Sequence, residues 1–380
     1  MAQQRPLRII HCFRSPVGGI FRHVRDLAEE HSRAGHDVGI LCDSTTGGAH
    51  EDALFDRITP YLSLGLTRLP IRRSVGTSDV SSLWSSYKHI KSLRPDVIHG
   101  HGAKGGVLAR VIGSALRVNK YRVARLYSPH GGSLHYRRNT PKGQGIFRLE
   151  RFMERFTDAL VFVCDYEQRT YESKVGTPRT LSRRVYNGIS DSEFATIPAR
   201  SDAVRFVYIG MLRDLKGPDL FIDAFAKTER LVGRPLSALM IGDGPDRDKY
   251  ETMMIEMGLG RRIGLLPPMP VHDALTMSNI IVVPSRAESM PYIVLESLAA
   301  GKAVIAASVG GIPEVLGQDS AALAQPASSD DLARIMADAI STPDWRETHM
   351  PDADNFRAVF SASAMAASVL TLYQELLNEI

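Results

Sequence analysis

Two glutamates stand eight positions apart in the segment AESMPYIVLESLAAG. Proline is favoured in the first turn of a helix and glycine just past its end, so Pro291 and Gly301 predict the two ends of a helix. Glu288 then precedes the helix, whereas Glu296 lies about 8 Å along it from Pro291, at 1.5 Å per residue. That separation is too long for one hydrogen-bonded carboxyl pair, but it suits contacts to two parts of an extended ligand. The alternative is a pair of solvated surface glutamates.

A second candidate group lies in YIGMLRDLKGPDLFIDAF, where Arg213 and Lys216 occupy a turn between an apolar strand and a helix. Two cations beside a helix N-terminus suit a diphosphate, because charge-assisted contacts to phosphate oxygens are about twice as strong as neutral ones. Gly18 and Gly19, in VGGIFRHV, hold the equivalent place after the first strand, where backbone N–H groups favour an anion. The alternatives are solvated charge for the two cations and a plain tight turn for the two glycines.

Histidines gather near the ends of two predicted strands, in PDVIHGHG and YSPHGGSLHY. Ligands of open α/β sheets bind at the C-terminal edge of the strands. His130, which two glycines follow, is therefore the candidate that faces a substrate, with a structural histidine as the alternative. His99 and His101 lack a clear third ligand in the sequence, so no metal site is predicted.

Strands alternate with helices along the chain, which is typical of parallel sheets joined by crossover helices. At 380 residues the chain is long enough for two domains, and the polar stretch ISDSEFATIPARSD separates two such series. We predict an α/β fold with parallel-sheet domains over 1–190 and 203–357, and expect the amphipathic segment at 358–380 to pack back on the first. Neither glycine-rich turn fits the G-x-G-x-x-G dinucleotide fingerprint, which disfavours a nicotinamide dehydrogenase.

Charge is divided unequally between the two halves of the chain. Residues 1–190 carry 30 Lys and Arg against 16 Asp and Glu, or +14, and the remainder carries 16 against 26, or −10. We expect the basic half to meet an anionic partner such as a phosphorylated substrate or a lipid surface. Nucleic acid is not an expected partner, because no basic motif with interleaved aromatic residues accompanies the charge.

The cysteines and the N-terminus indicate the compartment. Cys12, Cys42 and Cys164 are odd in number and set among apolar residues, which predicts reduced, buried thiols. No apolar run approaches the roughly 20 residues of a membrane-spanning helix, and MAQQRPLRIIHCF shows no signal-peptide pattern. We expect a cytoplasmic protein with peripheral contact to the inner face of the cytoplasmic membrane.

Six motifs together resemble glycosyltransferase family 4: AESMPYIVLE, GMLRDLKG, IGDGPDRDKY, ASVGGIPEV, VYNGIS and GGIFRHVRDLAEEHSRAGHDV. The resemblance covers nearly the whole chain. It implies the GT-B fold, in which two Rossmann-like domains face across a cleft, and retaining, metal-independent sugar transfer. SPHGGSLHY and AESMPYIVLE are more specifically similar to bacterial enzymes of exopolysaccharide, capsule or lipopolysaccharide assembly.

The resemblance also implies roles for side chains. Glu296 would bind the ribose of a nucleotide sugar, and Glu288 would face the transferred sugar. Arg213 and Lys216 would neutralise the diphosphate leaving group. His130 would contact the donor sugar near the reacting carbon.

Further donor contacts are implied for backbone groups and for one amide. The N–H groups of Tyr292 and Ile293 and the turn at Gly18 and Gly19 would contact phosphate. Asn187, at the crossing between the domains, is the remaining donor-binding candidate.

Two positions depart from the family pattern. Met211 follows the glycine of the phosphate loop where arginine is usual, and Arg213 comes two residues later. Pro291 stands where many members have glycine, which removes one N–H contact to phosphate.

The predicted function is transfer of a sugar from a nucleoside-diphosphate sugar to a hydroxyl of a lipid-linked glycan acceptor in cell-surface polysaccharide synthesis. Charge develops on the departing diphosphate, so fixed cations and helix N–H groups would be the main catalytic aid. No cofactor is expected besides the donor, whose nucleobase is not specified. Two alternatives stay open: a sugar-nucleotide epimerase of the same architecture, and a non-catalytic protein that binds nucleotide sugars.

Overall fold

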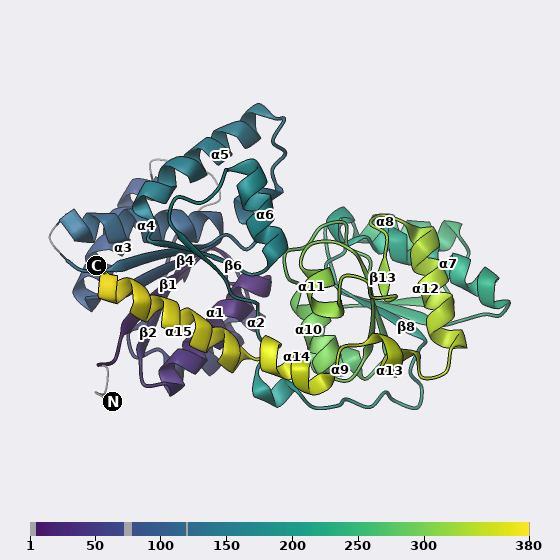
Figure 1. Ribbon diagram of the computed structural model, residues 1–380. Helices are drawn as coiled ribbons and strands as arrows, with labels where there is room; N and C mark the ends of the chain where they lie inside the picture. Colours follow the sequence, from purple (N-terminus) through teal and green to yellow (C-terminus); the bar gives the residue numbers. More distant parts are fainter. Residues whose placement is uncertain (1–4, 72–77, 119–120, 380) are drawn as a thin grey trace. The chain divides into compact units, whose positions relative to one another are not determined.

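The chain folds into two α/β units, which the computed structural model describes over residues 5–71, 78–118 and 121–379 (Figure 1). Unit 1 comprises Met1–Gly188 together with Ser361–Ile380, and unit 2 comprises Ile189–Phe360. Each unit has its own parallel sheet, which confirms the predicted α/β class.

The sheet of unit 1 has the strand order β3-β2-β1-β4-β5-β6-β7, and all of its strand pairs are parallel. Its strands are β1 (Arg8–Cys12), β2 (Asp37–Asp43), β3 (Gly65–Leu69), β4 (Val97–His101), β5 (Ala124–Ser128), β6 (Ala159–Phe162) and β7 (Leu181–Arg184). Apart from Arg8 at the start of β1, the central strands β1, β4 and β5 are buried along their whole length, as expected for a parallel sheet covered on both faces. Strand order reverses between β1 and β4, so ligands are expected beyond the C-terminal ends of these two strands.

The helices of unit 1 cover this sheet, and one of them comes from the far end of the sequence (Figure 1). They are α1 (Gly18–Arg33), α2 (Ala49–Ile58), α3 (Ser78–Leu93), α4 (Gly102–Val118), α5 (Pro141–Met153), α6 (Asp165–Lys174) and α15 (Ala362–Glu379), with short 3₁₀ turns η1 (Thr59–Tyr61), η2 (Gly132–His135) and η3 (Glu154–Phe156). α15 lies beside α1, and the two helices bury Leu27, Val369 and Tyr373 against Ile9 and Val97 of the sheet.

The amphipathic stretch near the C-terminus is divided between the two units. α14 (Ala353–Phe360) ends in unit 2, and α15 starts at Ala362 in unit 1. Ser361 separates the helices because its Oγ accepts a hydrogen bond from the N–H of Ala364 at 3.2 Å, which is the bond of a helix N-cap.

Helix α4 approaches the sheet of unit 1 so closely that glycine is required where it crosses. A Cβ on Gly105 would lie 2.2 Å from the carbonyl oxygen of Cys12, and one on Gly106 would lie 2.3 Å from the ring of Tyr127. The absence of these side chains lets α4 rest on the backbone of β1 and the aromatic ring of β5. All three cysteines of the chain are free and buried, as predicted.

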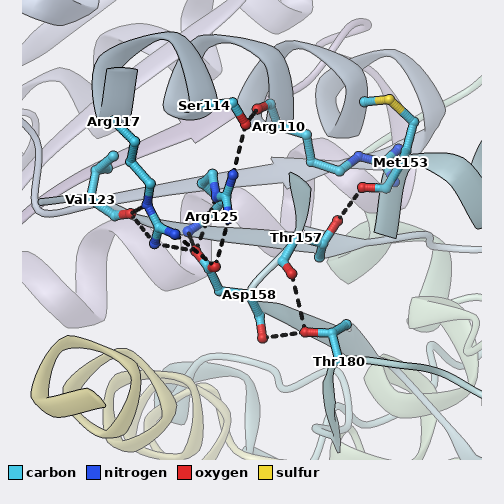
Figure 2. A network of polar contacts seen from close by, with 9 residues as sticks. All are labelled: Arg110, Ser114, Arg117, Val123, Arg125, Met153, Thr157, Asp158 and Thr180. Atoms are coloured by element: carbon cyan, nitrogen blue, oxygen red, sulfur yellow. Dashed lines mark hydrogen bonds and ion pairs between the residues drawn. The ribbon is translucent and has the colours of Figure 1, made fainter. Parts of the chain in front are cut away.

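Arginines of unit 1 serve its interior as well as its surface. Figure 2 shows Arg117 and Arg125 on the carboxylate of Asp158, with nitrogen to oxygen distances of 2.6 and 2.8 Å. Thr180 donates its hydroxyl to the carbonyl of the same aspartate. Arg110, which is fully buried, pairs with Glu150 at 3.1 Å. Part of the +14 charge is therefore neutralised by ion pairs inside unit 1, and these pairs join α4, β5, α5 and the start of β6.

The sheet of unit 2 has the order β10-β9-β8-β11-β12-β13, again with parallel pairs. Its strands are β8 (Phe206–Ile209), β9 (Ala238–Ile241), β10 (Ile263–Leu266), β11 (Ile280–Val283), β12 (Ala303–Ala307) and β13 (Leu323–Ala324). Its other elements, besides α14, are η4 (Asp191–Glu193), η5 (Asp214–Lys216), α7 (Pro218–Val232), α8 (Arg247–Glu256), α9 (Val271–Leu275), α10 (Tyr292–Ala299), α11 (Ile312–Leu316), α12 (Ser329–Ser341) and α13 (Trp345–His349). Strand order reverses between β8 and β11, which places the expected ligand edge of this unit beyond those two strands. Of the helices described in the two units, none combines the length and the apolar character that crossing a bilayer requires.

The close approach of α4 yields a stability prediction. Gly106→Ala should lower the free energy of unfolding by about 1–3 kcal/mol, because the new methyl group overpacks against Tyr127. Gly145→Ala is the matched control, since a Cβ there meets open space in α5, and it should stabilise by about 0.5–1 kcal/mol. Urea unfolding measures both, and equal stabilities for the two variants would contradict the packing argument.

Candidate active site

The loops that follow β8 and β11 meet at the C-terminal edge of the unit 2 sheet, where the strand order reverses. The first loop carries Lys216 and the second carries Glu288. Lys216 Nζ lies 2.5 Å from Glu288 Oε1, and the hydroxyl of Ser285 donates to the same oxygen at 2.7 Å. The side chain of Glu288 is 9% exposed and that of Lys216 is 32% exposed. The lysine is therefore the member of the pair that a ligand from solvent can reach.

Arg286 joins the two loops. Its guanidinium binds both carboxylate oxygens of Asp219 at 2.8 and 2.5 Å and donates to the carbonyl of Asp214 at 2.7 Å. Its backbone N–H donates to the carbonyl oxygen of Leu215 at 2.9 Å. Sequence reasoning missed this residue, although SRAE places an arginine two positions before Glu288. Because Arg286 ties the η5 loop to the Glu288 loop, it fixes the distance between Lys216 and Glu288.

Two glycines allow backbone to pack directly on backbone beside the pair. Gly217 has φ 67°, and a Cβ there would lie 2.2 Å from the carbonyl oxygen of Pro284. Gly310 has φ 62°, and a Cβ there would lie 2.2 Å from the carbonyl oxygen of Glu288. The loops after β8, β11 and β12 are thus stacked without intervening side chains, which restricts the movement of Glu288.

Helix α10 begins one residue later than predicted. Pro291 is its N-cap, with φ −76° and ψ 127°, and Tyr292 is its first residue. Gly301 has φ 71° just past the helix end, as its position in the sequence predicts. The N–H groups of Tyr292 and Ile293 open the helix, where the helix dipole favours an anion.

Glu296 and Arg213 occupy different surroundings from the Lys216–Glu288 pair. Glu296 is half-buried in α10 and lines a cavity of about 370 Å³ that neither Lys216 nor Glu288 lines. The two glutamates therefore do not act as one carboxyl pair, in agreement with their predicted separation. Arg213 is exposed at the start of η5.

In unit 1, His130 sits in a constrained turn after β5. Its φ is 50°, an unusual value for a residue with a Cβ, and the following Gly131 has φ 74°. The N–H groups of Gly131 and Val163 both donate to the buried carboxylate of Glu167. Glu167, which sequence reasoning also missed, thereby holds the turn that carries His130.

His130 belongs to a group of histidines that we call the histidine cluster, namely His11, His23, His31, His99, His101 and His130. His11 Nδ1 lies 3.0 Å from His101 Nε2, and His101 Nδ1 lies 3.0 Å from His130 Nε2. His23 Nδ1 lies 3.0 Å from Oδ1 of Asn187, a predicted donor-binding residue. Burial lowers the pKa of His99, His101 and His130 well below the ordinary value, so these rings are neutral at pH 7.

The cluster supplies ligands that the sequence analysis did not find. One ring nitrogen from each of His11, His99 and His101 lies within 4.8 Å of the other two, and the same holds for His23, His101 and His130. His11 lies far from His99 and His101 in the sequence, and the parallel pairing of β1 with β4 brings it opposite His99.

Gly18 and Gly19 are the first residues of α1 and are exposed. Gly18 has φ 69°, which explains the choice of glycine there. The predicted site residues therefore divide between the units: Lys216, Glu288, Arg213, Tyr292, Ile293 and Glu296 lie in unit 2, whereas Gly18, Gly19, His130 and Asn187 lie in unit 1.

Comparison with known families matches both halves of the chain. The profile of Glycosyltransferase Family 4 matches residues 17–193, and that of Glycosyl transferases group 1 matches residues 190–353. The chain is a family 4-type glycosyltransferase of the GT-B fold.

Relatives of this glycosyltransferase differ in how much of the chain they match. An uncharacterised glycosyltransferase of Methanocaldococcus jannaschii is 25% identical over 366 residues, which cover 95% of each chain. The D-inositol 3-phosphate glycosyltransferase of Corynebacterium glutamicum is 34% identical, over 47% of this chain and 44% of its own. The chain likewise matches less than half the length of the Streptosporangium roseum and Corynebacterium efficiens proteins of that name.

Solved structures share the fold at low sequence identity. HepE of Anabaena, in complex with UDP and glucose, has a TM-score of 0.78 at 17% identity and covers 97% of this chain and 99% of its own. A sucrose-phosphate synthase of Thermosynechococcus elongatus has a TM-score of 0.77 at 19% identity and covers 98% and 100%.

Burial of His31 in the glycosyltransferase yields a pH prediction. Burial lowers the pKa of His31 to about 4, although its hydrogen bond to the carbonyl of Ala366 acts in the opposite direction. A folded pKa below the unfolded value of about 6.5 means that stability is complete above pH 6.5 and is lost as the pH falls. His31→Gln should therefore gain about 2 kcal/mol relative to the parent between pH 7 and pH 5, as measured by urea unfolding.

The control for this prediction is His50→Gln, which removes an exposed histidine of the same unit. Its stability should follow that of the parent at both pH values. An unchanged difference between His31→Gln and the parent would show that His31 does not charge on unfolding.

Proposed function

We propose that this glycosyltransferase transfers a sugar from a nucleoside-diphosphate sugar to a hydroxyl of a lipid-linked glycan acceptor, with retention at the anomeric carbon and without a metal ion. The observation that carries the proposal is the Lys216–Glu288 pair at the switch point of unit 2, beside the start of α10. Support from known proteins comes from the family, and from HepE, which was solved with UDP and glucose.

The pair can divide two tasks between its members. Lys216, the more exposed partner, would turn from Glu288 to the diphosphate, aided by the N–H groups of Tyr292 and Ile293 and by Arg213. Glu288, held by Ser285, would then accept a hydroxyl of the transferred sugar. Glu296, at the other end of the segment, would bind the ribose hydroxyls.

Transfer needs one bond to break and one to form at the same carbon. The bond from the anomeric carbon to the phosphate oxygen breaks, and the acceptor oxygen bonds to that carbon. The proton of the acceptor hydroxyl passes to the departing phosphate, so no dedicated protein base is required. Lys216 and the helix N–H groups stabilise the negative charge that develops on the leaving group.

Unit 1 would supply the remaining donor contacts. His130 projects from a turn that Glu167 fixes, and Asn187 is held by His23, so both are preorganised. Gly18 and Gly19 open α1 with exposed backbone, which suits an anion. We assign His130 to the donor sugar and Asn187, Gly18 and Gly19 to donor binding.

The identity of the acceptor has two candidates. Cell-surface polysaccharide synthesis remains our proposal, on the strength of the sequence motifs. An inositol-containing acceptor is the second candidate, because the relatives include D-inositol 3-phosphate glycosyltransferases and a phosphatidylinositol N-acetylglucosaminyltransferase component of Arabidopsis thaliana. The latter is 22% identical over 357 residues, covering 90% of this chain and 76% of its own.

We further propose that α5 rests on an anionic membrane surface. Leu149 and Phe152 are 52% and 49% exposed, and Arg148 and Arg155 beside them are exposed as well. The acidic residues of this stretch, Glu150 and Glu154, are buried and paired with arginines. A helix face that is both basic and apolar is suited to the interface of an anionic bilayer.

A second basic stretch of unit 1, RVNKYRVARLY (117–127), is less suited to membrane contact. Arg117 and Arg125 bind Asp158 in the network of Figure 2, so their charge is already paired. Lys120 lies outside the described residues. We therefore restrict the proposed membrane surface to α5.

The nucleotide site can be tested before the sugar is known. One of UDP, GDP and ADP should raise the stability of the chain, by about 2.7 kcal/mol at 100 times its Kd. Lys216→Ala should lose most of that gain, whereas Lys249→Ala, which removes an exposed lysine of α8, should keep it. Thermal shift measures the stabilisation of the parent and of both variants by the nucleotide. Equal stabilisation of the parent and Lys216→Ala would refute the assignment of Lys216.

The transfer itself is tested with sugar derivatives of the nucleotide that binds. Glu288→Gln should retain nucleotide binding but lower transfer about 10²- to 10³-fold, the range seen when one group that stabilises a transition state is removed. Product analysis separates the alternatives: an epimerase would alter the sugar without an acceptor, and a binding protein would turn over nothing.

The membrane proposal has its own test. The parent chain should sediment with vesicles that contain phosphatidylglycerol and not with pure phosphatidylcholine vesicles. Leu149→Ser/Phe152→Ser should lose this binding, whereas Leu231→Ser/Ile255→Ser, which alters exposed apolar residues of unit 2, should not. Equal sedimentation of the two double variants would refute the assignment of α5.

A further inference from the structure

Three members of the histidine cluster converge from separate elements of unit 1. His23 comes from α1, His101 from the end of β4, and His130 from the turn after β5. One ring nitrogen from each lies within 4.8 Å of the other two. His23 and His101 are buried and His130 is half-buried, so His130 is the member of the group nearest to solvent.

The spacing of these rings fits a tetrahedral metal ion. Zinc binds imidazole nitrogen at about 2.0–2.1 Å, which places two tetrahedral ligand nitrogens about 3.3 Å apart. His101 Nδ1 and His130 Nε2 are 3.0 Å apart, so an ion requires them to separate by a few tenths of an ångström. The three ring centroids lie 4.7, 5.3 and 5.4 Å from one another, close to the roughly 5 Å expected around one ion.

The second nitrogens of two ligands already have partners that would fix the required tautomers. His23 Nδ1 faces Asn187 Oδ1 at 3.0 Å, and an amide oxygen can only accept, so His23 carries its proton on Nδ1 when neutral. His23 Nε2 is then a lone-pair nitrogen, and no hydrogen-bond partner for it is found in the described part of the chain. His101 Nε2 faces His11 Nδ1 at 3.0 Å, so His101 Nδ1 can bind an ion once its contact with His130 Nε2, itself a proposed ligand, opens. Such outer hydrogen bonds typically orient metal-binding histidines.

The deeper triad of His11, His99 and His101 is less suited to an ion. Both ring nitrogens of His99 are engaged, Nδ1 with the hydroxyl of Tyr373 at 2.7 Å and Nε2 with the hydroxyl of Ser128 at 2.8 Å. An ion there would have to break one of these bonds in a fully buried place.

We propose that His23, His101 and His130 form a binding site for a divalent transition-metal ion of the Zn²⁺ type. The ligand atoms are His23 Nε2, His101 Nδ1 and His130 Nε2, and the fourth position is left to water or an anion. Three neutral imidazoles suit zinc, nickel or copper rather than magnesium or calcium, which prefer oxygen. The proposed sugar transfer needs no ion, and because His130 is also assigned to the donor sugar, a bound ion would compete with the donor. Ion binding is measured with metal alone, so the two proposals can fail separately.

The experiment titrates the full chain, after treatment with a chelator, with Zn²⁺ by calorimetry and with Co²⁺ by visible absorption. We expect one high-affinity ion per chain and the intense bands of tetrahedral Co²⁺. His23→Gln should weaken binding at least about 100-fold. Asn187→Ala leaves every ligand in place and should weaken binding about 10- to 100-fold, so it provides a second measure if His23→Gln does not fold.

His31→Gln and His99→Gln are the matched controls, because each removes a buried histidine of the cluster that is not a proposed ligand. Both should bind Zn²⁺ and Co²⁺ like the parent. The assignment would be overturned by a parent that binds only weakly at several equivalents, by octahedral Co²⁺ spectra, or by loss of binding in His99→Gln with retention in His23→Gln.

Discussion

The reversal of strand order within each parallel sheet is the constraint on which both candidate sites depend. Where two neighbouring strands send their connections to opposite faces of the sheet, the loops beyond their C-terminal ends diverge and leave room for a ligand. In unit 2 the reversal lies between β8 and β11, and it brings Lys216 to Glu288 across 72 residues of sequence. In unit 1 it lies between β1 and β4, and it brings His11 to His101 across 90 residues.

Close backbone contacts restrict the movement of the loops and helices that carry the site residues. Gly217 and Gly310 allow the loops around Glu288 to stack carbonyl against backbone, and Arg286 links the same loops through its side chain. In unit 1, Gly105 and Gly106 lower α4 onto the sheet, so that its N-terminus follows His101 directly. Both units thus place small residues near the reversal, where the resulting rigidity keeps charged and polar groups in position without a ligand.

Sequence reasoning reached the α/β class, the order of the elements and the family because periodicity, punctuation by glycine and proline, and motif order are local properties. It placed Gly301 correctly just past the end of α10 but misjudged the start of the helix by one residue, since proline is compatible with both the N-cap and the first turn. It could not foresee that Lys216 pairs with Glu288, or that His11 completes a group with His99 and His101. The first contact depends on strand order and the second on strand order and register, which no single segment encodes. The arginines of Figure 2 show the same limit, because charge counted along a sequence does not reveal which cations are paired inside.

The passage of the chain through the two units has a consequence for synthesis on the ribosome. Unit 2 is inserted into unit 1, since the chain leaves unit 1 at Gly188 and re-enters it at Ser361. The apolar face of the first sheet that Val369, Leu372 and Tyr373 cover is made early, but α15, which covers it, is translated only after the whole of unit 2. Unit 2 can therefore complete its core while unit 1, which is translated first, still exposes Ile9 and Val97. A nascent chain of this kind needs protection against aggregation until residues 361–380 emerge.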